Sequence, residues 1–163
     1  MSSGSSDIFL LVQTKRAGKI KGEAATVGHE DEIIISSWRW GAQASSGLGA
    51  SGEAVRRSYS GLTVTKSIDS ASTGLLSALA TNDEVKEAVL TMRKSGGEAV
   101  DYFFVKLQEA RVVQVDHSSD DQGGTRETVT FAFRKVEVEY RRQQKGGGKG
   151  ASSVFNDEVV VAT

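Results

Sequence analysis

The two histidines of this sequence both stand among acidic residues that could complete a metal site. His29 opens the run 29–32 (HEDE), and His117 lies within 116–121 (DHSSDD). A catalytic zinc site uses three protein ligands, and without cysteine carboxylates would have to complete either set. Both runs lie where turns are expected, so they are typical of solvated acidic loops, and no Ser–His–Asp arrangement can be assembled with any specificity. We therefore predict no catalytic residue, no metal and no cofactor.

A glycine motif also invites a chemical interpretation. Gly47, Gly49 and Gly52 form a literal G-x-G-x-x-G. Dinucleotide-binding glycines directly follow a strand and open a helix, whereas this loop continues into a β pattern. The run 146–150 fails as a phosphate-binding loop because Lys149 is followed by glycine instead of Ser or Thr. Nucleotide binding is not predicted.

Composition excludes several classes of partner. The 163 residues suit one domain, and 20 basic against 21 acidic residues leave a net charge of −1. That balance gives no general attraction to nucleic acid or to an anionic membrane. The apolar run Ile8–Val12 is too short for a signal peptide or a membrane span, and no basic segment precedes it. We expect a chain made in the cytoplasm that leaves the cell only if a dedicated apparatus carries it.

The elements that would position any site are mainly strands, and the stretch 125–142 is the most informative. Apolar residues alternate at odd positions up to Phe133 and at even positions from Val136 to Tyr140. One extra residue in a continuous strand produces such a change, so we predict a β-bulge near Arg134–Lys135. A long strand that bends in mid-course suits a barrel wall.

Further patterns predict about nine strands and one helix. A strand over 32–40 places Ile34, Trp38 and Trp40 on one face and Arg39 on the other, and helical spacing of leucines predicts a short helix over 70–81. Separate strands are expected over 99–107 and 110–116, and a last strand over 154–161. The predicted core residues are Trp38, Trp40, Leu76, Leu79, Phe131, Phe133 and Tyr140.

One domain over 1–163 is expected to carry three irregular segments. Residues 1–6 form a polar tail, 41–57 an extended loop, and 143–152 a flexible basic connector before the last strand. A loop as long as 41–57 is usually functional or disordered in a compact domain.

Several stretches, in this order, resemble the haemolysin-coregulated protein (Hcp) family, the tube proteins of bacterial type VI secretion systems. They are DIFL at 7–10, KGE at 21–23, His29 with EI at 32–33, SWRWG at 37–41, LTVTK at 62–66 with Asp69, KEAVLTMRK at 86–94, ETV at 127–129 and VEVEY at 136–140. The resemblance covers nearly the whole chain.

The resemblance implies two packed antiparallel sheets forming a β-barrel, with one short helix on the side, and a hexameric ring that stacks into a hollow secreted tube. It places Arg39 toward the lumen, where the family often has a small residue; six guanidinium groups would then favour acidic cargo or narrow the channel. It also assigns ring stacking to the loop, whose candidate residues are Gly41, Gln43, Ser45, Gly47, Leu48, Gly49, Ser51, Gly52, Val55, Arg56 and Arg57.

The implied partners are other copies of the chain, effector proteins in the lumen, and the spike and sheath of the secretion apparatus. One alternative within the family is an effector chaperone or adaptor that forms rings without polymerising. Outside it, a monomeric barrel could bind a small ligand, and a hydrolase could use one of the histidine loops. The sequence favours a structural tube subunit that carries effectors and is not an enzyme.

Overall fold

The computed structural model describes residues 7–45, 56–94, 99–143 and 149–159. The elements are β1 (Asp7–Thr14), β2 (Gly18–Lys19), β3 (Ile33–Ile35), β4 (Ser37–Arg39), β5 (Ala42–Ala44), β6 (Arg57–Tyr59), β7 (Leu62–Lys66), α1 (Ser72–Ala80), β8 (Val85–Lys94), β9 (Val100–Ser119), β10 (Thr125–Ala132), β11 (Lys135–Gln143) and β12 (Lys149–Glu158). The mainly β class with one short helix is confirmed for this part of the chain.

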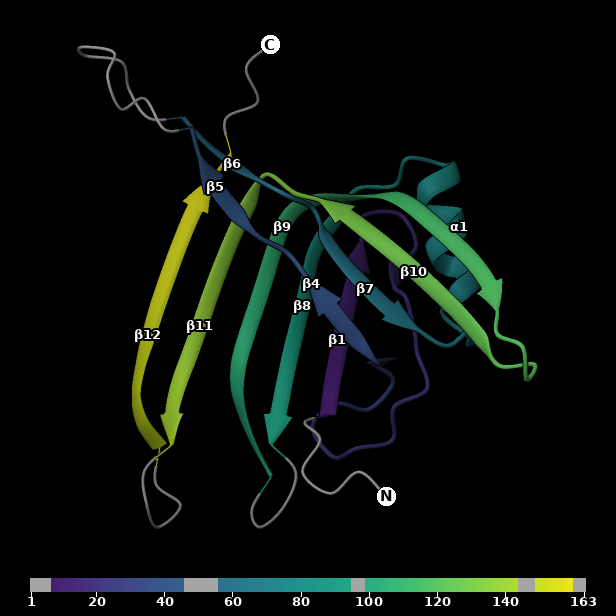
Figure 1. Ribbon diagram of the computed structural model, residues 1–163, viewed down its shortest axis with the longest axis horizontal. Helices are drawn as coiled ribbons and strands as arrows, with labels where there is room; N and C mark the ends of the chain where they lie inside the picture. The colour runs from purple at the N-terminus through teal and green to yellow at the C-terminus, as the bar shows by residue number, and fades with distance from the viewer. Residues whose placement is uncertain (1–6, 46–55, 95–98, 144–148, 160–163) are drawn as a thin grey trace.

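Two walls of antiparallel strands enclose the core. In Figure 1, β12, β11, β9, β8 and β1 run side by side, while β10, β7 and β4 cross in front of them. The core lies between the walls and includes Leu10, Leu90 and Val105 on one side and Val64 and Phe131 on the other, all 0% exposed. Helix α1 packs beside the two walls and covers one end of the core.

Strand β9 belongs to both walls. Its first half pairs with β8 and β11, and its second half pairs with β10. The buried positions change from Val105 and Leu107 to Ala110 and Val112, and Glu109 between them has a left-handed φ of 49°. One extra residue in that conformation reverses the alternation and turns the strand from one wall into the other. Two strands predicted over 99–107 and 110–116 are therefore one.

The predicted phase change in 125–142 is confirmed, but its cause is different. Phe131 and Val136 are both buried, so the inward positions do change from odd to even. The strand is not continuous, however: β10 ends at Ala132 in one wall, and β11 begins at Lys135 in the other. The amide of Arg134 donates to the carbonyl of Glu109, 3.2 Å away, so this corner lies against the bend in β9. The residues predicted to form a bulge instead connect the end of a strand in one wall to the start of a strand in the other.

A second change of wall divides the strand predicted over 32–40. Ile33 and Ile35 are buried in β3, which pairs with β1, whereas β4 starts at Ser37 and pairs with β7. The inward positions therefore change at Ser36. Ile34, expected beside the tryptophans, is 52% exposed instead.

The predicted core residues have three outcomes. Phe131 is fully buried, and Trp38, Trp40 and Phe133 are partly buried against the core. Three assignments are wrong, because Leu76 (41%), Leu79 (36%) and Tyr140 (46%) are exposed in the single chain.

Two physical causes explain these errors. On α1 the inward residues are Ser72, Leu75 and Ala78, and the leucine that follows each of the last two is rotated about 100° away from the sheets. Tyr140 lies on β11, which extends beyond the wall formed by β10, β7 and β4 (Figure 1).

Boundaries also differ in the predicted loop and connector. The extended loop 41–57 contains β5 and the first residue of β6, which form a two-stranded ladder of their own. The connector predicted over 143–152 includes the end of β11 and the start of β12, and β12 ends at Glu158 where a strand to 161 was expected. The predicted tail 1–6 lies outside the described residues.

Candidate functional site

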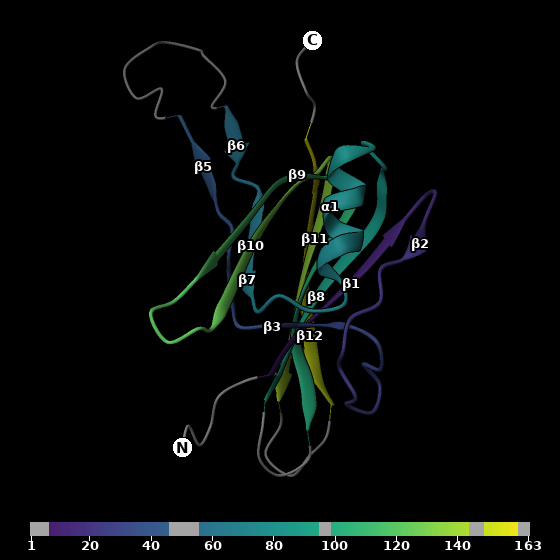
Figure 2. The ribbon, with the colours of Figure 1, turned by 90° about the vertical axis from the view of Figure 1, so that its right-hand side faces the viewer.

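The hairpin of β5 and β6 is the part of the predicted stacking loop that the structure describes. Ala42 pairs with Tyr59 and Ala44 with Arg57, and both strands project away from the two walls in Figure 2. The described stacking candidates are Gly41, Gln43, Ser45, Arg56 and Arg57, and all are exposed. The other candidates, Gly47, Leu48, Gly49, Ser51, Gly52 and Val55, lie outside the described residues.

A polar clamp fastens this hairpin to the last strand. The guanidinium of Arg57 donates to both carboxylate oxygens of Asp157 on β12, at 2.5 and 3.0 Å, and the hydroxyl of Tyr59 donates to the same carboxylate. A bidentate arginine–carboxylate pair fixes orientation as well as distance. The hydrogen bond from Arg57, followed by that from Tyr59, lowers the pKa of Asp157 to about 2.

The clamp predicts a dependence of stability on pH. Asp157 has a folded-state pKa of about 2, below its ordinary 3.8, so its contribution is present above pH 3.8 and is lost as pH falls toward 2. We expect Asp157→Asn to lower the thermal unfolding midpoint at pH 6. The gap between the parent and the variant should narrow steadily toward pH 2. A gap of constant size across this range would show that the carboxylate charge is not what matters.

Aromatic side chains support the clamp from inside. The ring of Trp40 stacks on that of Tyr59 with centroids 5.8 Å apart, and Phe133 contacts both from the corner between β10 and β11. Trp38 points the same way and stacks on Phe103 at 5.7 Å. The tryptophan pair thus joins β4 and the hairpin base to the walls, as predicted for packed residues rather than for a ligand platform.

Arg39 lies on the opposite face of β4, as the alternation predicts. It is exposed and pairs in register with Thr63 on β7, whose hydroxyl lies 3.0 Å from that of Thr130 on β10. Within the described ranges the guanidinium of Arg39 makes no hydrogen bond or ion pair. The outer face of this wall therefore carries hydroxyl groups and a positive charge that has no partner among the described residues.

His29 is buried in contacts with neighbouring side chains, not solvated as the sequence suggested. Only 6% of it is exposed, and its ring stacks on Phe9 with centroids 4.4 Å apart. Nδ1 lies 2.9 Å from Glu32 and Nε2 lies 3.0 Å from Asp101, which also accepts from Arg93. The carboxylates meet opposite edges of the ring and do not converge on one point, so the arrangement joins a loop to β9 and does not form a metal site.

A buried charge network was missed by the sequence reasoning. Lys66 and Glu127 are almost wholly buried and form an ion pair, and the ammonium of Lys66 also lies 2.8 Å from Asp69. Ser72 donates to Glu127 at 2.8 Å, and Nε2 of His117 lies 2.6 Å from its other oxygen. The network, defined by these five residues, ties α1 to β7, β9 and β10.

The environment of Glu127 favours its charged form. Burial raises the pKa of this carboxyl, but the hydrogen bonds from Lys66, His117 and Ser72 together outweigh burial and hold the pKa below its ordinary value. Alternation could have located the pair, because Lys66 continues the inward series of Leu62 and Val64, and Glu127 that of Val129 and Phe131.

Two negative findings apply to the described part of the chain. No group of three or more His, Cys, Asp or Glu side chains is arranged to hold a metal ion there. Its single described helix is too short to cross a membrane.

Comparison with known proteins gives consistent matches over nearly the full length. A family model described as "Type VI secretion system effector, Hcp" matches residues 9–140. The chain is 34% identical over 154 residues to protein hcp1 of Pseudomonas aeruginosa, covering 91% of each sequence.

Comparison with solved structures also gives similar proteins that cover most of the chain. Hcp1 from Salmonella typhimurium is similar with 28% identity and a TM-score of 0.70, covering 95% of this chain and 99% of that one. A variant of Hcp1 from E. coli EAEC 042 has a TM-score of 0.78 at 22% identity, covering 95% of this chain and all of that one, and this likeness concerns the fold alone.

Proposed function

Since this chain belongs to the Hcp family of type VI secretion proteins, we propose that it forms hexameric rings that stack into the inner tube of a type VI apparatus. Family membership makes it a secreted, non-enzymatic protein. The barrel of each subunit would close between the two walls, and effector proteins would travel in the lumen with the spike and sheath as further partners. The observation that carries this proposal is the projecting hairpin with its clamp to β12.

The hairpin suits contact between rings. It stands clear of the two walls, exposes all of β5, and is fixed at its base by Arg57, Tyr59 and Asp157. A segment held rigidly at the base loses less conformational entropy when it docks than a free loop of equal length. This supports a stacking role for the segment and argues against a merely tolerated surface insertion.

Exposed apolar side chains support a closed ring. Tyr140 on β11 and Phe155 on β12 are about half exposed, and Leu76 and Leu79 are exposed on α1, at the other side of the walls. A ring needs two different patches, because each subunit meets its neighbours through opposite sides. Separate apolar surfaces on a chain of balanced charge fit that requirement.

The solution mass tests the ring directly. Light scattering on a sizing column should give about six times the 17.4 kDa chain, and negative-stain images should show rings with an open centre. A monomer at high concentration would contradict the proposal and favour a ligand-binding barrel. Rings that never stack, even when concentrated, would favour the chaperone or adaptor alternative.

Arg39 leads to a prediction about cargo. In the proposed ring, six copies would line the lumen with guanidinium groups. We expect Arg39→Ser to leave ring assembly intact, because the side chain is exposed and makes no contact with a carboxylate among the described residues, and to reduce retention of acidic effectors. Co-purification of an acidic effector with either ring measures this. Equal retention by an intact variant ring would refute the role of Arg39.

A further inference from the structure

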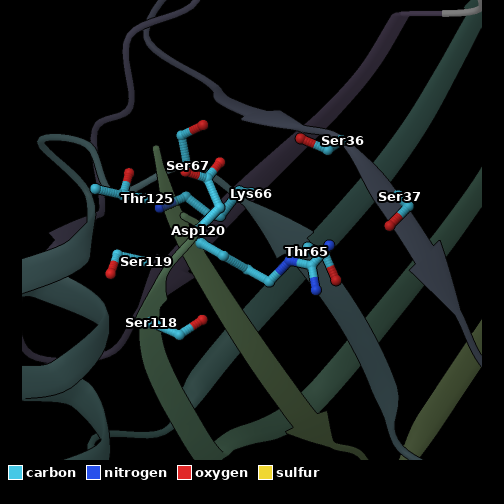
Figure 3. Close-up of a pocket in the computed structure, with 10 residues that line it drawn as sticks. Ser36, Ser37, Thr65, Lys66, Ser67, Ser118, Ser119, Asp120 and Thr125 are labelled. Carbon is cyan, nitrogen blue, oxygen red and sulfur yellow. The ribbon is translucent and has the colours of Figure 1, made fainter. Parts of the chain in front are cut away.

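A polar hollow of about 420 Å³ lies at the end of the β4–β7–β10 wall, between that wall and the tip of the β9–β10 hairpin. Figure 3 shows its hydroxyl groups arranged around the opening, from β4, from the end of β7 and from the end of β9. Its hydroxyl-bearing residues include Ser36, Ser37, Thr65, Ser67, Ser118 and Ser119.

Three charged residues line the hollow, and two of them are already committed. Lys66 is 1% exposed and belongs to the buried charge network. Asp120 uses its carboxylate within the hairpin turn, where Oδ1 accepts from the amides of Gln122 and Gly124 at 2.9 and 2.6 Å. Arg126 is exposed and has no ion pair or hydrogen bond from its side chain within the described ranges. Arg126 is therefore the cation of the hollow that has no partner within the described ranges, while Asp120 keeps its negative charge and would oppose an anion placed beside it.

The hydroxyl groups complete a set of donors. Those of Ser36, Ser37, Ser67, Ser118 and Ser119 have no hydrogen-bond partner among the residues that the structure describes. Hydroxyl groups and a guanidinium all donate to an oxyanion, and the guanidinium can do so through two parallel bonds. Since hydroxyl groups can also accept hydrogen bonds, it is the guanidinium that gives this lining its preference for a carboxylate, which the hydroxyl groups can then hold by donating to it.

A second uncommitted guanidinium lies on the same face of the wall. Arg39 follows Ser37 by two residues along β4, a spacing of about 7 Å, and both point away from the core side of that strand. A free ion in the hollow would reach only Arg126, whereas an extended acidic segment could contact Arg126 and Arg39 together. Asp116, also on this face, shares its carboxylate with the amide of Gln114 at 2.7 Å and would oppose such a ligand.

We propose that this hollow is a binding site for side-chain carboxylates of an acidic protein segment, with Arg126 as its charged donor. The binding itself is a property of each subunit. Its use for cargo rests on the proposed function, because only a tube subunit would present the face to an enclosed effector.

The test is fluorescence polarisation of a labelled tetraglutamate peptide at constant low ionic strength, with a tetraglutamine peptide as the neutral control. We expect saturable binding of the acidic peptide alone, at least tenfold weaker binding to Arg126→Gln, and tighter binding to Asp116→Asn. The matched control is Arg134→Gln, an exposed arginine at the corner of the two walls, which should bind like the parent.

Several outcomes would overturn the site. Equal affinity for both peptides, or an Arg126→Gln variant that binds like the parent, would do so. Inorganic phosphate that binds as tightly as the acidic peptide, with equal loss in Arg126→Gln, would assign the hollow to a free oxyanion and refute the acidic segment. Light scattering on the same samples separates the two proposals: rings without peptide binding refute this site only, and binding by monomers refutes the ring only.

Discussion

Lys66→Met is expected to destabilise the protein by about 3–5 kcal/mol, because it leaves the carboxylate of Glu127 buried without its cation. Glu127 is 0% exposed and cannot regain water without opening the junction between α1 and the β7–β10 wall. Urea unfolding at fixed protein concentration would measure the loss, since an assembled protein has a concentration-dependent stability.

Two further variants make the result specific. Lys106→Met removes a partly exposed lysine whose partly exposed partner Glu87 lies 3.3 Å away, and it should cost less than about 1 kcal/mol. Lys66→Met combined with Glu127→Gln should recover part of the loss, because a neutral amide has no charge to compensate and can still accept from Ser72. Equal losses for Lys66→Met and Lys106→Met would contradict the importance of burial.

Phe131→Ala is the second large effect, with an expected loss of about 3–5 kcal/mol. Phe131 is 0% exposed and lies just before the corner where the chain passes from one wall to the other. Truncation leaves a cavity between the walls, and the paired strands β7 and β9 on either side limit how far it can collapse.

Phe155→Ala is the matched control for that substitution. Phe155 is 49% exposed at the edge strand β12, so the same truncation should cost the single chain only about 1 kcal/mol. Urea unfolding of both variants at one concentration gives the comparison. If the two substitutions cost the same in a dilute monomer, the two phenylalanines cannot differ in burial as described.

Alternation allowed the sequence to predict strands and their inward residues, but not the wall to which each strand belongs. The change of phase between Phe131 and Val136 is visible in the sequence. A bulge within one strand and a corner between two walls produce the same local pattern. Only pairing partners distinguish them, and those lie elsewhere in the chain, at Leu62 for β10 and at Phe155 for β11.

The helix and Tyr140 show a different limit of prediction from sequence patterns. Leu75, Leu76 and Leu79 all fit a helical stripe, and α1 contains no charged residue to mark its outer face. The sequence therefore could not choose the inward leucine. Tyr140 follows the inward alternation of β11, yet it is exposed because no strand of the described chain covers that part of the sheet.

Some residues of the candidate site could also be predicted from alternation, and others could not. The outward position of Arg39 followed from alternation with Trp38 and Trp40. The inward positions of Lys66 and Glu127 were equally available from alternation, although charged residues are not usually expected inside. The clamp between Arg57 and Asp157 joins residues 100 positions apart, and no local sequence pattern predicts such a contact.

The passage of β9 through both walls has a consequence for how the molecule comes apart and forms. The ladders to β8 and β11 use one half of this strand and the ladder to β10 uses the other, while the apolar core lies between the two walls, so unfolding of either wall exposes the inward residues of both. The two layers therefore form one cooperative unit, with a single transition instead of successive melting of sheets. Folding of that unit is expected to be slow, because β1 must pair with β8 and β7 must pair with β10 across long stretches of chain before either wall is complete.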